Sequence, residues 1–200
     1  MKIYSENEID KLVEILKNDG VISVPTDTVF GVCARINSKI ALNKLIEIKH
    51  RPKNKIFPIM CANIEQIKEI AIVDNKVEDL IRAFMPGPIT LVLNKNPKFD
   101  GYIKSTNSTI AIRMATSELL ERMISKLGTP VYMSSANLSR EPVCKNLDEI
   151  EKSCPNLDGM LEGTVKYNIS STIVNCSNND FEILREGPIS KNDILKTLNN

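Results

Sequence analysis

The chain has 200 residues, with 26 Lys and Arg against 25 Asp and Glu, so its formal net charge is +1. This length predicts a single domain over residues 1–200, able to bury about 70% of the surface that its unfolded chain exposes. The balanced charge identifies no partner and excludes a strongly basic surface overall, so any anion site must come from local clustering of cationic side chains.

Hydrophobic periodicity predicts helices and strands that alternate along the chain. The first helix begins at a capping box formed by Ser5 and Glu8, and Gly20 predicts its end. Alternation of this kind, without an internal repeat, is typical of α/β or mixed α+β proteins. In chain order, the predicted elements are a helix over 5–20, a strand over 21–25, a helix over 38–50, a strand over 55–61, helices over 63–71 and 75–85, a turn and strand over 86–95, a strand over 109–114, a helix over 117–128, a strand over 130–137, a helix over 147–154, strands over 171–177 and 181–187, and a helix over 190–198.

Two of these predictions concern how strands pair. The segment 55–61 contains Pro58, which cannot donate to a strand ladder and therefore predicts an edge strand or a bulged strand. The strands over 171–177 and 181–187 flank Asn178, Asn179 and Asp180, which are typical turn residues, so we expect a hairpin there.

Several kinds of site and location are not supported by the sequence. Neither a G-x-G-x-x-G motif after a strand nor a P-loop motif occurs. The five cysteines are scattered, without a CxxC pair, and His50 is the one histidine, so a zinc centre is not expected. No apolar run approaches about 18 residues and the first residues do not resemble a signal peptide, which predicts a cytoplasmic protein.

Oxygen-bearing side chains follow the predicted strand at 21–25. In "VISVPTDTVFGV", Thr26, Asp27 and Thr28 come directly after the strand, and Gly31 allows backbone to approach a ligand closely. Ligands gather at strand ends in sheets with helical connections, so these residues are candidates for a binding site. The alternative is a turn whose Thr and Asp side chains cap the local backbone.

The segment "KHRPKNK" concentrates positive charge. Pro52 disfavours the helical region for Arg51, which predicts an extended segment whose side chains alternate between two faces. The residues Lys49, Arg51, Lys53 and Lys55 would then form one cationic row, suited to a triphosphate or a nucleic-acid backbone. The alternative is a solvated run of charge after a helix.

Two further groups of polar residues stand at strand ends. "MSSANLS" offers three serines and Asn137 for a phosphate, ribose or carboxylate, although serine-rich turns are common. Arg113 alternates with apolar neighbours in the strand over 109–114, so an inward orientation would require an anionic partner. An exposed face of an edge strand is the alternative. Ser171, Thr172 and Arg185 complete the candidates.

Together these motifs carry a resemblance. "PTDTVFG", "KHRP", "MPGPITLVL", "STIAIR", "SSANLS", "STIV" and "ILREGPI" occur in the order and approximate spacing of the YrdC/TsaC family of L-threonylcarbamoyladenylate synthases, over residues 8–190. Phe30 and Val32 stand where family members usually have Tyr and Leu. The resemblance implies the short single-domain form, with a twisted open α/β sheet flanked by helices and a positively charged concave face.

The resemblance also implies a reaction. The family joins L-threonine, bicarbonate and ATP into threonylcarbamoyl-AMP and releases pyrophosphate. A threonylcarbamoyl transferase complex then modifies the adenosine beside the tRNA anticodon. Both reactants are anions, so the expected catalyst neutralises charge and aligns the groups, without an enzyme nucleophile. Mg²⁺ is expected to be held mainly by the ATP phosphates and water.

The resemblance assigns roles to residues of this sequence. Val143 stands where relatives often have a hydroxyl residue, so a side-chain contact would be lost there. The implied catalytic residues are Lys49, Arg51, Ser135 and Asn137; the implied threonine-binding residues are Thr26, Thr28 and Arg113; the implied ATP-binding residues are Arg51, Lys55, Thr109, Ser135, Val143 and Arg185.

Two other functions remain open from the sequence. One is a module that binds tRNA or double-stranded RNA, which the cationic row would suit; the balanced charge, the 4% aromatic content and the absence of Trp argue against it. The other is a paralogue with a different carbamoyl-adenylate or acyl-adenylate reaction, because the same module also occurs inside a hydrogenase-maturation carbamoyltransferase. Threonine-dependent release of pyrophosphate distinguishes the synthase from both.

Overall fold

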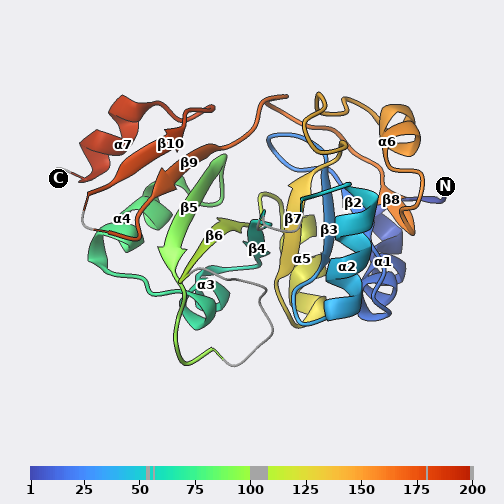
Figure 1. The fold of residues 1–200 in the computed structure, drawn as a ribbon, viewed down its shortest axis with the longest axis horizontal. Helices are drawn as coiled ribbons and strands as arrows, with labels where there is room; N and C mark the ends of the chain where they lie inside the picture. The colour runs from blue at the N-terminus through green and yellow to red at the C-terminus, as the bar shows by residue number, and fades with distance from the viewer. Residues whose placement is uncertain (53–54, 56, 100–107, 179, 199–200) are drawn as a thin grey trace.

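The computed structural model describes residues 1–52, 55, 57–99, 108–178 and 180–198. Within this part, ten strands form one mixed sheet in the order β1-β8-β2-β3-β7-β4-β6-β5-β9-β10, with helices packed on it (Figure 1). The predicted mixed α/β class is therefore confirmed. The strands are β1 (Ile3–Tyr4), β2 (Ile22–Val24), β3 (Gly31–Arg35), β4 (Ile59–Cys61), β5 (Ile89–Asn94), β6 (Thr109–Met114), β7 (Val131–Ser135), β8 (Gly159–Leu161), β9 (Thr172–Asn175) and β10 (Glu182–Arg185).

Several helices begin or end at their predicted capping residues, but the prediction for Gly20 was wrong, since α1 ends at Lys17 and Asp19 adopts the left-handed region at φ 62°. Ser38 and Ser117 accept hydrogen bonds from the first turns of α2 and α5, and Gly128 ends α5 in the left-handed region at φ 76°. Before α1, the Ser5 N–H donates to the Glu8 carboxylate at 3.2 Å, as the capping box predicts. The helices are the short 3-10 helix η1 (Glu6–Glu8), α1 (Ile9–Lys17), α2 (Lys39–Ile48), α3 (Ile64–Ile70), α4 (Asn75–Phe84), α5 (Glu118–Leu127), α6 (Leu147–Ser153) and α7 (Lys191–Leu198).

The prediction of an edge or bulged strand at 55–61 was wrong. β4 begins only at Ile59 and lies inside the sheet, parallel to β6 and antiparallel to β7. Pro58 precedes the paired residues, so its missing N–H costs no ladder bond, and its carbonyl accepts from the Met133 N–H at 2.8 Å. A proline at the entrance of a strand is therefore compatible with a central position.

The sequence patterns missed three strands and identified one hairpin correctly. β1 and β8 have two and three residues, too few for a period to emerge. β3 begins at Gly31, directly after the polar turn, and pairs with β2 on one side and β7 on the other. The predicted hairpin is confirmed as β9 and β10, which are antiparallel; Asn179, in its turn, lies outside the described residues.

One half of the sheet is covered by helices on both faces (Figure 1). We call β1, β8, β2, β3 and β7 the covered half. Helices α1 and α5 bury one of its faces, where Leu16 and Met123 share a core with Cys33. Helix α2 buries the other face, where Leu45 shares a core with Ala34. Side chains of alternate residues along β3 therefore enter different cores.

The other half has one covered face and one that is only partly buried. We call β6, β5, β9 and β10 the open half, and β4 joins it to the covered half. Helices α3, α4 and α7 lie on one side of it (Figure 1), where Leu91 and Ile112 are 0% exposed. On the opposite face, the neighbouring residues Val92 and Ala111 are half-buried. This face borders the candidate site.

Candidate active site

A cavity of about 380 Å³ lies where the covered half meets the open half. Three arginines contribute to its wall, and no Asp or Glu is among its described lining residues. A cavity with this charge favours an anionic ligand. Its lining consists of Thr26, Thr28, Val29, Gly31, Arg51, Pro58, Thr90, Ala111, Arg113, Met133, Ser134, Ser135, Ser170, Ser171, Ile173 and Arg185.

The turn after β2 forms the floor of the cavity. The Thr26 hydroxyl donates to the Val29 carbonyl at 2.6 Å and accepts from the Thr28 and Val29 N–H groups, both at 3.3 Å. The interpretation of this segment as a capped turn is therefore correct for Thr26. The same turn presents Thr26 and Thr28 to the cavity, so capping and site formation occur together.

Arg113 is the buried cation of this floor. It lies on the same face of β6 as Ala111 and is 7% exposed. Its guanidinium donates to Thr28 Oγ1 at 3.0 Å, to Asp27 Oδ1 at 2.8 Å and to the Gly87 carbonyl at 3.0 Å. The anionic partner that an inward arginine requires is thus Asp27. Among the described residues, Arg113 Nε and Asp27 Oδ2 have no hydrogen-bond partner.

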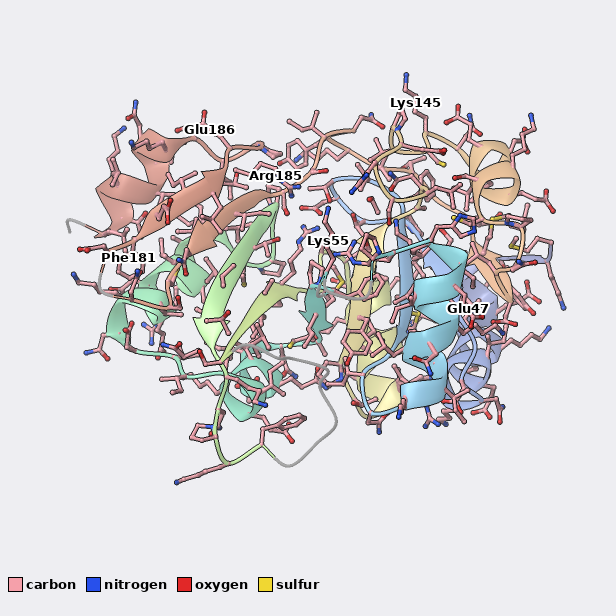
Figure 2. All side chains as sticks on the ribbon, viewed as in Figure 1. Glu47, Lys55, Lys145, Phe181, Arg185 and Glu186 are labelled. Carbon is pink, nitrogen blue, oxygen red and sulfur yellow. The ribbon has the colours of Figure 1, made fainter. Side chains whose placement is uncertain are left out.

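Arg185 approaches the cavity from the end of β10. Its Nε and Nη2 donate to the Ser171 carbonyl at 2.9 and 2.8 Å, and Ser171 in turn contacts the Thr90 hydroxyl at 2.7 Å. In Figure 2, Arg185 extends toward the middle of the molecule, in the direction of Lys55. Burial, and next the positive charge of Arg113, lower the pKa of Arg185. An anion between the two guanidinium groups would relieve that repulsion.

The predicted extended cationic row at 49–55 was wrong. Lys49 keeps helical backbone angles at the C-terminal end of α2, and His50 then adopts the left-handed region at φ 46°. The Lys55 N–H donates to the Pro52 carbonyl at 3.0 Å, which closes a turn. Among the described residues, Lys49 and Arg51 therefore do not alternate along one extended segment. Lys53 lies outside the described residues.

Lys49 and Arg51 point to different places. Lys49 is 1% exposed, and its ammonium donates to the carbonyls of Ser135 and Asn137 beneath the cavity wall. Burial lowers the pKa of Lys49 to about 8. Arg51 lines the cavity, and its guanidinium lies 4.3 Å from the ring centroid of Phe57. Of these two predicted catalytic cations, only Arg51 reaches the cavity.

Ser135 and Asn137 are also separated by the structure. Ser135 lines the cavity and its hydroxyl donates to Asn137 Oδ1 at 2.5 Å. Asn137 is buried and does not line the cavity; its amide nitrogen donates to the carbonyls of Leu138 and Glu141 at 3.0 and 2.6 Å. The Asn137 side chain thus stabilises the loop after β7.

Three residues that the resemblance assigned to ATP lie outside the cavity lining. Lys55 is exposed, and Val143 is half-buried in the loop before α6. Thr109 begins β6 on the same face as Arg113, but roughly 13 Å farther along the strand. A nucleotide that touched Lys55, Val143 and Thr109 would extend well beyond the cavity.

Thr172, another candidate from the sequence, has a structural role. Its hydroxyl donates to the Ile189 carbonyl at 2.7 Å and accepts from the Gly187 N–H.

Thr90 and Ser170 also line the cavity and were not among the candidate residues predicted from the sequence. Thr90 carried a usable signal, because it is a hydroxyl residue inside the apolar run of β5. Gly31 was expected to allow a close approach. Its hydrogen faces Met133, and an added Cβ would lie 2.4 Å from the Met133 sulfur. Its small size therefore serves cavity-wall packing.

In the described ranges, no three His, Cys, Asp or Glu residues are grouped as metal ligands. None of the described lining residues of the cavity carries a carboxylate, the side chain by which proteins usually hold Mg²⁺. None of the described helices is long and apolar enough to cross a membrane.

Comparisons with known proteins agree on one relationship. A family model named Sua5_yciO_yrdC, described as "Telomere recombination", matches residues 14–187. A threonylcarbamoyl-AMP synthase of Klebsiella pneumoniae is 32% identical over 159 residues, which are 76% of this chain and 83% of the relative. A putative threonylcarbamoyl-AMP synthase of Methanocaldococcus jannaschii is 30% identical over 201 residues, covering 96% of this chain and 95% of the relative.

A solved structure shares the fold closely. The crystal structure of P. abyssi Sua5 complexed with L-threonine matches with a TM-score of 0.91 and 25% identity. The match covers 99% of this chain and 61% of the archaeal one, so this chain spans about three fifths of that protein's length.

Proposed function

The chain belongs to the Sua5/YciO/YrdC family, and from that membership we propose that it synthesises L-threonylcarbamoyladenylate from L-threonine, bicarbonate and ATP, with release of pyrophosphate. The observation that carries the proposal is the cavity between the sheet halves, whose described lining contains Arg51, Arg113 and Arg185 and no carboxylate. Asp27, outside that lining, pairs with Arg113, so Arg51 and Arg185 supply the net positive charge. Every reactant is anionic or carries an anionic group, so this is the charge that the reaction needs.

L-Threonine would occupy the floor of the cavity. Thr26 and Thr28 lie there beside Arg113, and all three residues line the cavity. A positively charged donor at that place would fix the amino acid by its carboxylate and leave its amine free. The P. abyssi relative, which shares the fold, was crystallised with L-threonine, and this supports threonine as the amino acid that is bound.

The nucleotide phosphates would lie against Arg51 and Arg185. Bicarbonate takes up a proton and dehydrates to carbon dioxide and water. The threonine amine then adds to the carbon dioxide and loses a proton, which gives a carbamate. A carbamate oxygen then attacks the α-phosphorus of ATP, and the bond to pyrophosphate breaks. Attack of one anion on another is slow in water, and fixed guanidinium groups offset the charge repulsion and hold the line of attack.

The remaining assignments are proposals that rest on the resemblance. Contacts of the nucleoside with Lys55, Thr109 and Val143 require it to extend over the neighbouring surface. Mg²⁺ would arrive on the ATP phosphates as part of the substrate, and no step above depends on a protein-bound metal. A threonylcarbamoyl transferase complex would consume the product on tRNA, and the five free cysteines suit a cytoplasmic location. Direct RNA binding stays a prediction.

The test is threonine-dependent pyrophosphate release. The protein is incubated with ATP, Mg²⁺ and bicarbonate, with and without L-threonine, and the adenylate is identified by mass spectrometry. We expect pyrophosphate only with all substrates, and we expect Arg51→Ala to abolish it, which excludes a contaminating enzyme. Binding of RNA without any threonine-dependent pyrophosphate would instead favour the RNA-binding function.

A further inference from the structure

The ammonium group of Lys49 is enclosed by oxygen atoms of the loop that follows β7. It donates to the Ser135 carbonyl, to the Asn137 carbonyl at 2.6 Å and to Asn137 Oδ1 at 3.4 Å. An ammonium has three N–H donors, so these oxygens satisfy all of them. Lysine ammonium groups usually remain in water, yet this residue is 1% exposed.

The backbone of Lys49 also bonds to this loop, this time as an acceptor. The Lys49 carbonyl accepts from the Ser139 N–H at 3.1 Å and from the Ser139 hydroxyl at 2.9 Å. The C-terminal end of α2 therefore holds the loop at Ser135, Asn137 and Ser139. Within the loop, the Asn137 side chain bonds to the Glu141 carbonyl at 2.6 Å and closes the turn.

Ser135 connects this network to the cavity. It pairs with Gly31 across β3 and β7, it lines the cavity, and its hydroxyl is directed to Asn137. Its carbonyl is one of the oxygens bound by Lys49. A shift of the Lys49 ammonium would therefore move a wall of the cavity without any contact between Lys49 and a ligand.

We propose that Lys49 is a positioning residue, which acts through the Ser135–Ser139 loop and makes no contact with the nucleotide phosphates. The inference rests on the proposed function for the reaction that it serves. To reach a phosphate, the ammonium would have to abandon the Asn137 carbonyl and leave the Ser135 carbonyl with the Asn137 N–H as its donor at 3.0 Å. Arg51, two residues later, already lines the cavity, so the two cations have different roles.

The experiment compares Lys49→Met with Lys39→Met. Methionine keeps an apolar stem and removes the ammonium, and Lys39 is the exposed first residue of the same helix, so its variant controls for loss of charge. Without substrates, amide hydrogen exchange over 135–141 should rise at least about 10-fold in Lys49→Met and stay unchanged in Lys39→Met. The kcat should fall at least about 100-fold, while KM for ATP changes less than about threefold.

Two results would overturn the proposal. Unchanged exchange over 135–141 would show that Lys49 does not hold the loop. A KM for ATP raised about 10-fold or more would show that the ammonium contributes to nucleotide binding. A purely structural role would lower the amount of folded protein, which active-site titration corrects for, and would not separate kcat from KM.

A measurement on the unchanged protein covers the case in which Lys49→Met does not fold. The ammonium protons of Lys49 should give an observable NMR signal, because buried and bonded ammonium groups exchange slowly with water. Addition of ATP and Mg²⁺ should leave this signal in place; a large shift or its loss would indicate phosphate contact and overturn the proposal. If the wild-type protein releases no pyrophosphate, the proposed function fails, and exchange and NMR still decide how Lys49 acts.

Discussion

Side chains alternate between two faces in both halves of the sheet, but the covered half buries both faces and the open half buries one. In the covered half, Val32 and Cys33 are consecutive residues and both are 0% exposed, because helices lie on both faces. In the open half, Leu91 is 0% exposed and Val92 is half-buried. Leaving one face without helices thus frees every second residue of a strand for a site, while the alternate residues still hold the core.

The two halves also supply different parts of the cavity. The covered half contributes residues at strand ends, Thr26, Thr28 and Ser135, which hydrogen bonds within their own turns hold in place. The open half contributes Thr90 and Arg113 from within its strands. The first group is fixed by backbone geometry, and the second projects from a rigid surface.

The largest expected effect is the loss of activity on changing Arg113, and it tests the comparison directly. Arg113→Lys should lower kcat/KM by at least about 1000-fold, because the ammonium cannot reproduce the planar contacts with Thr28, Asp27 and a ligand. Arg35→Lys is the matched control, since Arg35 is also a strand arginine paired with an aspartate, Asp19, at 2.7 Å, but in the covered half. Pyrophosphate release should stay within about threefold of wild type in that variant. If kcat/KM fell equally in Arg113→Lys and Arg35→Lys, the arginine of the open half would have no special role in the reaction.

Within β5, a substitution on the face covered by helices should destabilise the protein more than one on the half-buried face. Leu91→Ala should lower the free energy of unfolding by about 2–5 kcal/mol, because it leaves a cavity in the core against the helices. Val92→Ala, on the half-buried face, should cost less than about 1 kcal/mol. Urea unfolding of both variants measures the difference. Similar costs at the two positions would show that the second face is as tightly packed as the first.

The selectivity for the amino acid tests whether Thr26 and Thr28, from the covered half, form one binding pocket with Arg113. Loss of one methyl group from L-threonine should cost about 1–3 kcal/mol, so serine should be a poor but detectable substrate. Leucine, with a larger side chain and no hydroxyl, should not react. Steady-state kinetics with the three amino acids provide the comparison. Equal kcat/KM for leucine and threonine would contradict the assignment of this floor.

Salt should have the smallest effect. The guanidinium groups of Arg51 and Arg185 are near the surface, so their attraction for ATP is partly screened by ions. Raising KCl from about 0.05 M to about 0.5 M should weaken ATP binding by about 3- to 10-fold, while L-threonine binding at the buried Arg113 should change less. Calorimetric titrations at both salt concentrations measure this. If salt weakened the binding of L-threonine more than the binding of ATP, the charges that salt screens would lie at Arg113 and not at Arg51 and Arg185.

The sequence supports most of the elements and part of the site, and the failures have physical causes. Thr26, Thr28, Ser135 and Arg185 could be predicted because polar residues after strands tend to gather at one edge. The separation of Arg51 from Lys49 could not be predicted, because the left-handed backbone of His50 lies between them and no local rule requires it.

Other failures come from contacts between distant segments. β1 and β8 are strands only because β1 pairs with β8 and β8 pairs with β2, and their lengths carry no periodicity. Pro58 reads as a strand breaker until the beginning of β4 is known. The Asp27 partner of Arg113 is 86 residues away, so only the folded chain shows that the arginine is neutralised internally.

The place of β8 in the sheet has a consequence for biosynthesis. β8 lies between β1 and β2, and its residues leave the ribosome about 135 residues after β2. At typical rates of translation this is a delay of roughly 7–27 s, during which β2 has β3 on one side and an unpaired edge on the other. Unpaired strand edges attract other chains, so the nascent protein passes through an aggregation-prone interval that ends when Gly159–Leu161 arrives.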